Sequence, residues 1–208
     1  MGTVHESSHP LVRHKITLLR SVTTQPKKFR EIVRELTSLL AYEATADLAL
    51  APVDVVTPLT STTGAEIIDR IALVPILRAG IGMVDGFLEV IPTAEVWHIG
   101  LYRDHQTLEP VEYYRKQPDH PLADVFYVLD PMLATGGSAS ATMHMLHAWG
   151  ATRVIYLGLI AAPEGIARLT RDHPDTDIYV AAIDDHLDER GYIVPGLGDA
   201  GDRLFGTH

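Results

Sequence analysis

The sequence predicts an α/β fold in which helices cover both faces of a parallel sheet. Short segments that are almost continuously apolar, such as residues 71–77 and 153–162, are typical of strands buried on both faces of such a sheet. Segments with helical periodicity alternate with these strands along the chain, as they do in β-α-β units. The length of 208 residues fits one domain with one sizeable core.

The elements are expected in a regular order. Residues 1–50 form a helical arm, with an irregular helix over 11–20 and an amphipathic helix that runs from Gln25 towards Leu50. A hairpin with its turn at Gly64 is expected in "VDVVTPLTSTTGAEI". Strands are then predicted at 71–77, 95–102, 124–130, 153–162 and 177–184, and helices at 80–91, 138–150 and 163–173. The acidic stretch 184–190 is interpreted as a solvated turn.

The composition excludes several classes of function. The formal net charge of -10 argues against a protein whose main role is to bind nucleic acid, because that role needs a basic face. Without cysteine, the chain has no disulfide, thiolate metal site or cysteine nucleophile. Residues 1–21 lack a signal-peptide pattern, and no apolar run reaches the roughly 18 residues of a membrane span. The expectation is a cytoplasmic protein with neither a membrane nor a nucleic-acid partner.

The stretch "VLDPMLATGGSASAT" contains the strongest chemical signal. Ligands of parallel sheets bind beyond the carboxyl ends of the strands, and Asp130 ends a predicted buried strand. Pro131 stops the strand, and Gly136 and Gly137 let backbone N–H groups approach an anion before a helix starts at Ser138. These features suit a phosphate beside a group that carries hydroxyls.

The glycines of this stretch do not by themselves establish a phosphate site. An ordinary strand-to-helix turn would use the same glycines. The stretch lacks the lysine of G-x-x-x-x-G-K-[ST] and the spacing of G-x-G-x-x-G, so a triphosphate P-loop and a dinucleotide site both fit badly. A monophosphate next to a polyol fits better.

The acid, the bend and T-G-G-S together resemble the loop that binds 5-phosphoribosyl 1-diphosphate (PRPP) in type I phosphoribosyltransferases. Most of these enzymes carry two adjacent acids there, whereas Asp130 is followed by Pro131, as in the uracil phosphoribosyltransferase family. Further segments are similar to that family in the same order: "LLAYEATADL", "VPILRAGIGMVDG", "LYRDHQTLEPVEYY", "AAPEGI" and "GYIVPGLGDAGDRLFGT". The resemblance covers nearly the whole chain.

This resemblance implies a fold, a reaction and partners. The fold is a type I phosphoribosyltransferase domain over residues 1–208, with a flexible, β-rich lid at about 102–123 and a base-binding segment at about 184–208. The reaction is uracil + PRPP → UMP + diphosphate, a step of pyrimidine salvage, with Mg2+ as the cofactor. The family also implies a homodimer or higher homo-oligomer, and GTP or another nucleotide as an effector.

Site residues follow from the same resemblance. Arg78 and Arg103 would hold the diphosphate and phosphoribosyl parts of PRPP, and Asp199 would approach PRPP or its magnesium, through water and not as a direct ligand. The PRPP loop would consist of Asp130, Pro131, Met132, Leu133, Ala134, Thr135, Gly136, Gly137 and Ser138. Uracil would bind at Ile193, Gly198, Asp199 and Ala200. The catalytic contributions are assigned to Asp130, Arg103, Arg78 and Asp199, with no general base identified.

Two alternative functions are disfavoured, and two minor features have ordinary roles. A regulator on the same fold that binds RNA is disfavoured by the acidic charge, and a purine or orotate transferase by "YIVPGLGDAG". His144 and His147 lie at i, i+3 on a predicted helix but lack a third metal ligand, so a surface or interface role is expected. Glu164 lies near a strand end, and two interpretations stay open: contact with the site, or the role of an acid in the first turn of a helix.

Overall fold

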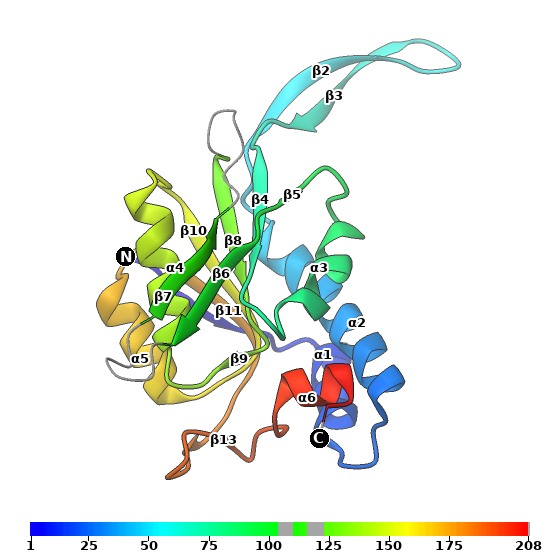
Figure 1. Ribbon diagram of the computed structural model, residues 1–208. Helices are drawn as coiled ribbons and strands as arrows, with labels where there is room; N and C mark the ends of the chain where they lie inside the picture. The colour runs from blue at the N-terminus through cyan, green and yellow to red at the C-terminus, as the bar shows by residue number, and fades with distance from the viewer. Residues whose placement is uncertain (104–109, 116–122, 208) are drawn as a thin grey trace.

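The structure, a computed structural model, describes residues 1–103, 110–115 and 123–207, and between residues 99 and 115 it describes the backbone only. In this part of the chain a seven-stranded sheet forms the centre (Figure 1). Its strands are β1 (Val4–Glu6), β4 (Ile71–Pro75), β5 (Glu95–Val96), β8 (Val125–Leu129), β9 (Met132–Leu133), β10 (Val154–Ala161) and β11 (Asp177–Ile183). The spatial order is β1-β11-β10-β8-β4-β5, with β9 beside β10, and the pairings are parallel. The predicted parallel α/β sheet is confirmed.

Helices cover both faces of this sheet because its central strands are apolar on both. On one face, Leu73, Tyr127 and Leu157 belong to a core shared with the first helices of the chain. On the other face, Val74, Val128 and Tyr156 form a second core. Helices α1 (Pro10–Arg20), α2 (Pro26–Ala44), α3 (Ile81–Leu88) and α6 (Ala200–Phe205) pack on the first face, and α4 (Gly137–Ala148) and α5 (Pro163–Asp172) on the second.

The helical arm lies on the sheet. The side chains of Phe29, Ile32 and Leu36, spaced for one helical face, are fully buried or nearly so. Pro26 begins α2, where its missing N–H costs no hydrogen bond. Helix α2 contacts β10, β11 and α3, and it ends at Ala44, short of the predicted end.

The predicted strand at 95–102 is wrong as a single element. Strand β5 pairs with β4 in the sheet, whereas β6 (Ile99–Arg103) leaves the sheet and pairs antiparallel with β7 (Pro110–Arg115). Both pieces have the same apolar pattern, so periodicity alone did not separate them. The β6–β7 hairpin falls within the predicted lid, and residues 104–109 and 116–122 of that lid lie outside the described residues.

The predicted hairpin is confirmed, but its turn is misplaced. Strands β2 (Leu50–Val56) and β3 (Ser61–Ile67) pair antiparallel and project from the body of the molecule (Figure 1). Gly64 lies inside β3, opposite Val53. The turn is formed by residues 57–60 because the Thr57 hydroxyl accepts hydrogen bonds from the backbone N–H groups of Leu59 and Thr60.

Two features near the chain ends were not predicted. Strand β1 is too short to show a pattern, and its parallel pairing with β11 holds it at the sheet edge. Strands β12 (His186–Leu187) and β13 (Ile193–Val194) pair antiparallel before α6.

The interpretation of 184–190 as solvated is wrong at its first residue, since Asp184 is 5% exposed and forms an ion pair with Arg20. Among the described residues, no helix is long and apolar enough to span a membrane.

Candidate active site

The sheet contains a topological switch point between β4 and β8. From β4 the chain passes through α3, on one face, to β5, whereas from β8 it passes through α4, on the other face, to β10. The loops after β4 and β8 therefore diverge. Ligands of such sheets bind in the crevice beyond the carboxyl ends of the two strands at this point. The loop after β4 packs against the end of β8, because a Cβ added at Gly80 would lie 2.3 Å from the Leu129 carbonyl oxygen.

The loop after β8 ends at the amino end of α4, as predicted. Gly136 has a φ of 73°, which favours glycine, and α4 begins at Gly137. Helix α5 closes on this loop from behind: a Cβ at Gly165 would lie 2.4 Å from the Ala134 carbonyl oxygen. Gly165 thus packs against the back of the loop that leads into α4. The first N–H groups of a helix lack acceptors within the helix, which is why anions favour such a helix end.

Asp130 occupies the expected place at the end of β8. Burial raises the pKa of Asp130 to about 7, and the Met132 N–H, at 3.4 Å, only partly opposes this shift. The Tyr156 hydroxyl on β10 donates to the backbone carbonyl of Asp130 at 2.9 Å and thus holds the bend after β8. Burial, followed by the nearby Asp130 charge, raises the pKa of Tyr156, so this hydroxyl remains a donor.

Arg168 on α5 is a neighbour of this loop that the sequence did not reveal. A Cβ added at Gly137 would lie 3.2 Å from Nη1 of Arg168 and 3.7 Å from Oγ1 of Thr135. The guanidinium and the hydroxyl therefore flank the same point at the start of α4. Arg168 Nε lies 3.5 Å from Asp172 Oδ2, one turn further along α5. The spacing of "PEGIARLTRD" predicts a helix but does not indicate that Arg168 faces the loop.

Arg78, in the loop after β4, meets the C-terminal helix. Its Nη2 lies 3.3 Å from Asp202 Oδ1, and the side chain is 60% exposed. Asp199 caps the amino end of α6 by accepting a hydrogen bond from the Asp202 N–H at 2.9 Å. A Cβ at Gly201 would lie 3.2 Å from Asp199 Oδ1 and 3.4 Å from Arg78 Nη2. The structure thus brings together Arg78 and Asp199, which are 121 positions apart in the sequence.

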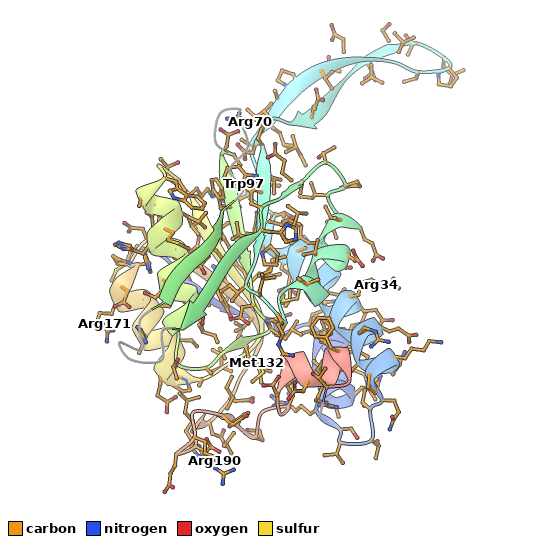
Figure 2. The ribbon with its side chains drawn as sticks, in the orientation of Figure 1. Arg34, Arg70, Trp97, Met132, Arg171 and Arg190 are labelled. Carbon is orange, nitrogen blue, oxygen red and sulfur yellow. The ribbon has the colours of Figure 1, made fainter. Side chains whose placement is uncertain are left out.

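The predicted base-binding segment also approaches the predicted phosphate loop. A Cβ added at Gly191 would lie 3.7 Å from the Thr135 methyl carbon. Glu164 supports this approach by accepting a hydrogen bond from the Leu187 N–H at 3.1 Å, in addition to its place in the first turn of α5. Figure 2 shows Met132 at the edge of the sheet that faces α6, and Arg190 at the tip of the C-terminal segment.

Within the base-binding segment, the predicted uracil residues lie on irregular backbone. Ile193 is 4% exposed and begins β13, and Ala200 begins α6. Gly198 has a φ of 80°, which favours glycine and leaves its backbone bare. The Val194–Pro195 peptide bond is cis, as is Leu77–Arg78 in the loop after β4.

Two further expectations concern the Arg103 side chain and a magnesium ion. Arg103 ends β6, but its side chain lies outside the described residues. Within the described part of the chain, no three His, Asp or Glu side chains gather in a way that could hold a metal ion. The carboxylates of Asp130 and Asp199 are nevertheless oxygen donors of the kind that Mg2+ prefers, so both suit a hydrated magnesium ion brought by a ligand.

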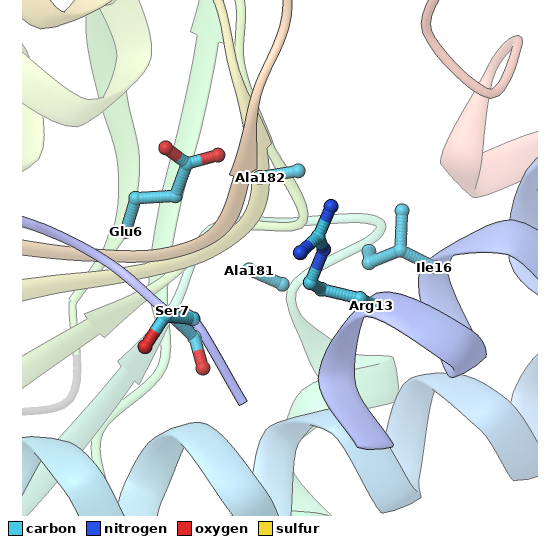
Figure 3. A pocket seen from close by; sticks show the side chains of 7 residues that line it. Glu6, Ser7, Arg13, Ile16, Ala181 and Ala182 are labelled. Atoms are coloured by element: carbon cyan, nitrogen blue, oxygen red, sulfur yellow. The ribbon is translucent and has the colours of Figure 1, made fainter. Parts of the chain in front are cut away.

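A separate pocket of about 360 Å³ lies at the other edge of the sheet (Figure 3). Glu6, Ser7, Arg13 and Ala181 are among the residues that line it. None of the predicted site residues lines this pocket.

Comparisons with known proteins show the family and the fold of this chain. A family model described as uracil phosphoribosyltransferase matches residues 6–207. A uracil phosphoribosyltransferase of Roseiflexus castenholzii is 62% identical over 207 residues and one of Exiguobacterium sibiricum 55% over 208, each covering 100% of both chains. The solved structure of the AQ2163 protein from Aquifex aeolicus is 37% identical, with a TM-score of 0.91 over 99% of both chains. A hypoxanthine phosphoribosyltransferase from Trypanosoma cruzi shares the fold, with 13% identity and a TM-score of 0.50 over 76% of this chain and 75% of that chain.

Proposed function

Because this chain belongs to the uracil phosphoribosyltransferase family, we infer that the crevice between β4 and β8 is its active site. The chain transfers the phosphoribosyl group of PRPP to uracil and forms UMP and diphosphate, a pyrimidine salvage step. The observation that carries the proposed site is the meeting of three features at one switch point: the glycine loop before α4, the Asp130 carboxyl group and the Arg78 guanidinium.

The 5-phosphate of PRPP binds at the start of α4 in this proposal. Backbone N–H groups at Gly136, Gly137 and Ser138 would donate to it, and the helix dipole favours its negative charge. The hydroxyls of Thr135 and Ser138 add donors. Support comes from the glycine conformation at Gly136 and from the tight contact of Gly165 behind the loop. The guanidinium of Arg168 adds positive potential at the same point.

Asp130 is assigned to the ribose. Its carboxylate would accept hydrogen bonds from the ring hydroxyls and would favour the positive charge that develops on the ribose as diphosphate leaves. A pKa of about 7 means that the carboxyl group is only partly ionised near neutral pH in the free protein. Developing positive charge on the ribose stabilises the ionised form, so the attraction is greatest in the transition state.

Arg78, Arg103 and Asp199 are assigned to the diphosphate. The exposed guanidinium of Arg78, only loosely paired with Asp202 at 3.3 Å, can turn to the leaving polyanion. Mg2+, when bound, supplies further neutralisation of the diphosphate oxygens. Asp199 would hold this ion through water. Residues 102–123 are proposed to form the lid that shields PRPP from hydrolysis.

Uracil recognition is assigned to backbone groups at Ile193, Gly198 and Ala200. Uracil presents an acceptor, a donor and an acceptor along one edge, which N–H and C=O groups can match. Cytosine would place an amine where the carbonyl belongs and leave a buried group unpaired, so it is strongly rejected. The bare backbone at Gly198 supports a close approach of the base.

The assembly is proposed to be a homodimer or higher homo-oligomer. The β2–β3 hairpin supports this because it exposes large apolar side chains, with Val56 at 84% and Leu59 at 96% exposure. A GTP effector and a cytoplasmic location stay predictions that rest on the sequence and its family resemblance.

One experiment tests the proposed function. The purified protein is incubated with PRPP, Mg2+ and, in turn, uracil, cytosine, orotate, adenine and guanine, and the nucleotides formed are identified. UMP from uracil is expected, at a rate that falls when a chelator removes the magnesium. Nucleotide formation from another base at a comparable rate would overturn the assignment. Tight, steeply salt-dependent RNA binding without any turnover would favour the regulator instead.

A further inference from the structure

The segment 193–200 has almost no internal means of holding its shape. It contains the two residues of β13 and then irregular chain up to α6. If backbone groups here bind the base, their positions must be fixed by something outside the segment, because a shift of about 1 Å is enough to lose a productive geometry.

Arg20, at the end of α1, holds the middle of this segment. Its Nη1 donates to the Gly196 carbonyl oxygen at 2.8 Å and to Asp184 Oδ2 at 2.7 Å. Its Nη2 donates to Asp184 Oδ1. The guanidinium therefore uses its planar fork on a carboxylate and a carbonyl at once, a geometry that a lysine ammonium cannot reproduce.

Asp184 completes the arrangement from the end of β11. Its Oδ2 also accepts a hydrogen bond from the Gly196 N–H at 2.9 Å. Both backbone groups of Gly196 are thus bound, one by Arg20 and the other by Asp184. The side chain of Asp184 is 3% exposed and that of Arg20 is 23% exposed, so water competes little for these bonds.

A second arginine fixes the next residue to the same part of α1. Arg203 Nη1 donates to the carbonyl oxygens of Leu197 at 2.8 Å and Leu19 at 2.7 Å, and Nη2 donates to that of Ser21 at 2.6 Å. Its guanidinium lies 4.4 Å from the centre of the Phe29 ring. The carbonyls of residues 196 and 197 are therefore both tied to the last turn of α1.

We propose that Arg20 and Asp184 are positioning residues for base recognition, an inference that rests on the proposed assignment of uracil to residues 193–200. Neither contacts the base. They fix Gly196 and thereby the flanking backbone at Ile193 and Gly198. The phosphate loop is held instead by β10 and α5. Loss of the pair consequently impairs the use of uracil far more than the use of PRPP.

The test compares initial-rate kinetics of Arg20→Lys and Asp184→Asn with wild type. Each substitution keeps a polar side chain of similar size but breaks the shared geometry. Lys15→Met is the matched control, because Lys15 also forms an ion pair from α1, to Glu35, outside the base segment. Gly198→Ala serves as a reference for the base site, since its φ of 80° makes any side chain shift the backbone there.

Circular dichroism first establishes that each variant is folded at the assay temperature. The KM for uracil is expected to rise about tenfold in Arg20→Lys and Asp184→Asn, with the KM for PRPP changed less than about twofold. Lys15→Met should retain both values. A general loss of structure would instead lower kcat or raise both KM values together, and this outcome would overturn the positioning role.

The reference variant separates two kinds of failure. If Gly198→Ala raises the KM for uracil but folded Arg20→Lys and Asp184→Asn do not, the positioning role is wrong and the base site stands. If none of the three changes the KM for uracil, the assignment of residues 193–200 to uracil is wrong as well.

Discussion

The phosphate loop and the base-binding segment form two sides of one crevice but are held in opposite ways. The phosphate loop is built locally, from the end of β8, two glycines and the start of α4, and neighbouring elements only press against it. The base-binding segment has little regular structure and depends on a side chain far away in the sequence. Arg20 pairs with Asp184, the first residue of the segment, and is 164 positions away from it.

This difference separates the parts of the site that stabilise the fold from those that do chemistry. Asp184 and Gly196 in the base-binding segment are paired with each other and with Arg20, so removal of one partner is costly. The phosphate loop keeps a half-buried aspartate, Asp130, whose carboxyl group has a raised pKa, and this costs stability in the free protein. Removal of the Arg20 cation and removal of the Asp130 charge should therefore change the free energy of unfolding in opposite directions.

The largest loss of stability is expected from Arg20→Ala. The substitution leaves the Asp184 carboxylate buried without its cation, and such broken pairs cost about 3–5 kcal/mol of unfolding free energy. Urea denaturation monitored by circular dichroism measures it. Arg153→Ala is the control, because its ion pair with Asp47 is exposed and should contribute less than about 1 kcal/mol. A similar small loss in both variants would contradict the difference drawn between buried and exposed pairs.

Asp130→Asn should act in the opposite direction and depend on pH. The pKa of Asp130 is about 7 in the folded protein and near 4 in the unfolded chain. The favourable contribution of protonated Asp130 to the free energy of unfolding is therefore complete below pH ~4. It is lost as the pH rises through ~7. The ligand-free variant should gain between about 1 and 4 kcal/mol relative to wild type from pH 5 to pH 8, measured by urea denaturation at each pH.

The gain in stability of Asp130→Asn should be accompanied by a loss of activity. Asp130→Asn should lower kcat about 100-fold or more, because the uncharged amide cannot stabilise positive charge on the ribose. In wild type, kcat/KM for PRPP should rise with pH through about 7 as Asp130 ionises, and the variant should lack this rise. Near-normal turnover in the variant would remove the charge of Asp130 from the mechanism.

A smaller loss is expected from Gly136→Ala in the phosphate loop. The φ of 73° disfavours a side chain, and a Cβ there would lie 2.9 Å from the Gly165 carbonyl oxygen. A loss of about 1–2 kcal/mol of unfolding free energy should accompany a raised KM for PRPP. Gly137→Ala is the matched stability control, since its nearest neighbour would be the end of the Arg168 side chain. Equal losses in both would show that loop conformation is not what matters.

The smallest change in stability is expected from Arg78→Ala. The side chain is 60% exposed and its ion pair with Asp202 is long, so less than about 1 kcal/mol of unfolding free energy should be lost. The KM for PRPP should nevertheless rise markedly, because a cation is removed from the diphosphate. Thermal unfolding and initial-rate kinetics of the same preparation check both parts. A large loss of stability with unchanged PRPP kinetics would place Arg78 in the fold and not in the site.

The same contrast explains what could be predicted from the sequence. The parallel sheet and the phosphate loop follow from local patterns: apolar strands, an acid at a strand end and glycines before a helix. Tyr156 and Arg168 were missed because a tyrosine in an apolar strand and an arginine on an amphipathic helix look ordinary. In the structure, Tyr156 donates a hydrogen bond to the Asp130 carbonyl, and Arg168 lies beside Gly137.

Long-range pairing accounts for two further errors. Asp184 was interpreted as solvated because its acidic neighbours dominate the local sequence, whereas its partner lies in the first helix. The segment predicted as one strand at 95–102 forms two, β5 in the sheet and β6 in a hairpin. Which strand each piece pairs with depends on its neighbours in space, and periodicity does not reveal them. The identity of the ligand came from the family resemblance, because the loop alone indicates only a phosphate beside a polyol.

The most direct test of the two-sided crevice is initial-rate kinetics with uracil and PRPP varied independently, for Arg78→Ala and Arg20→Lys side by side. The KM for PRPP should rise in Arg78→Ala with little change for uracil, and the KM for uracil should rise in Arg20→Lys with little change for PRPP. If both variants shift the same constant, or both constants equally, the two sides of the crevice are not held independently and the division drawn between them is contradicted.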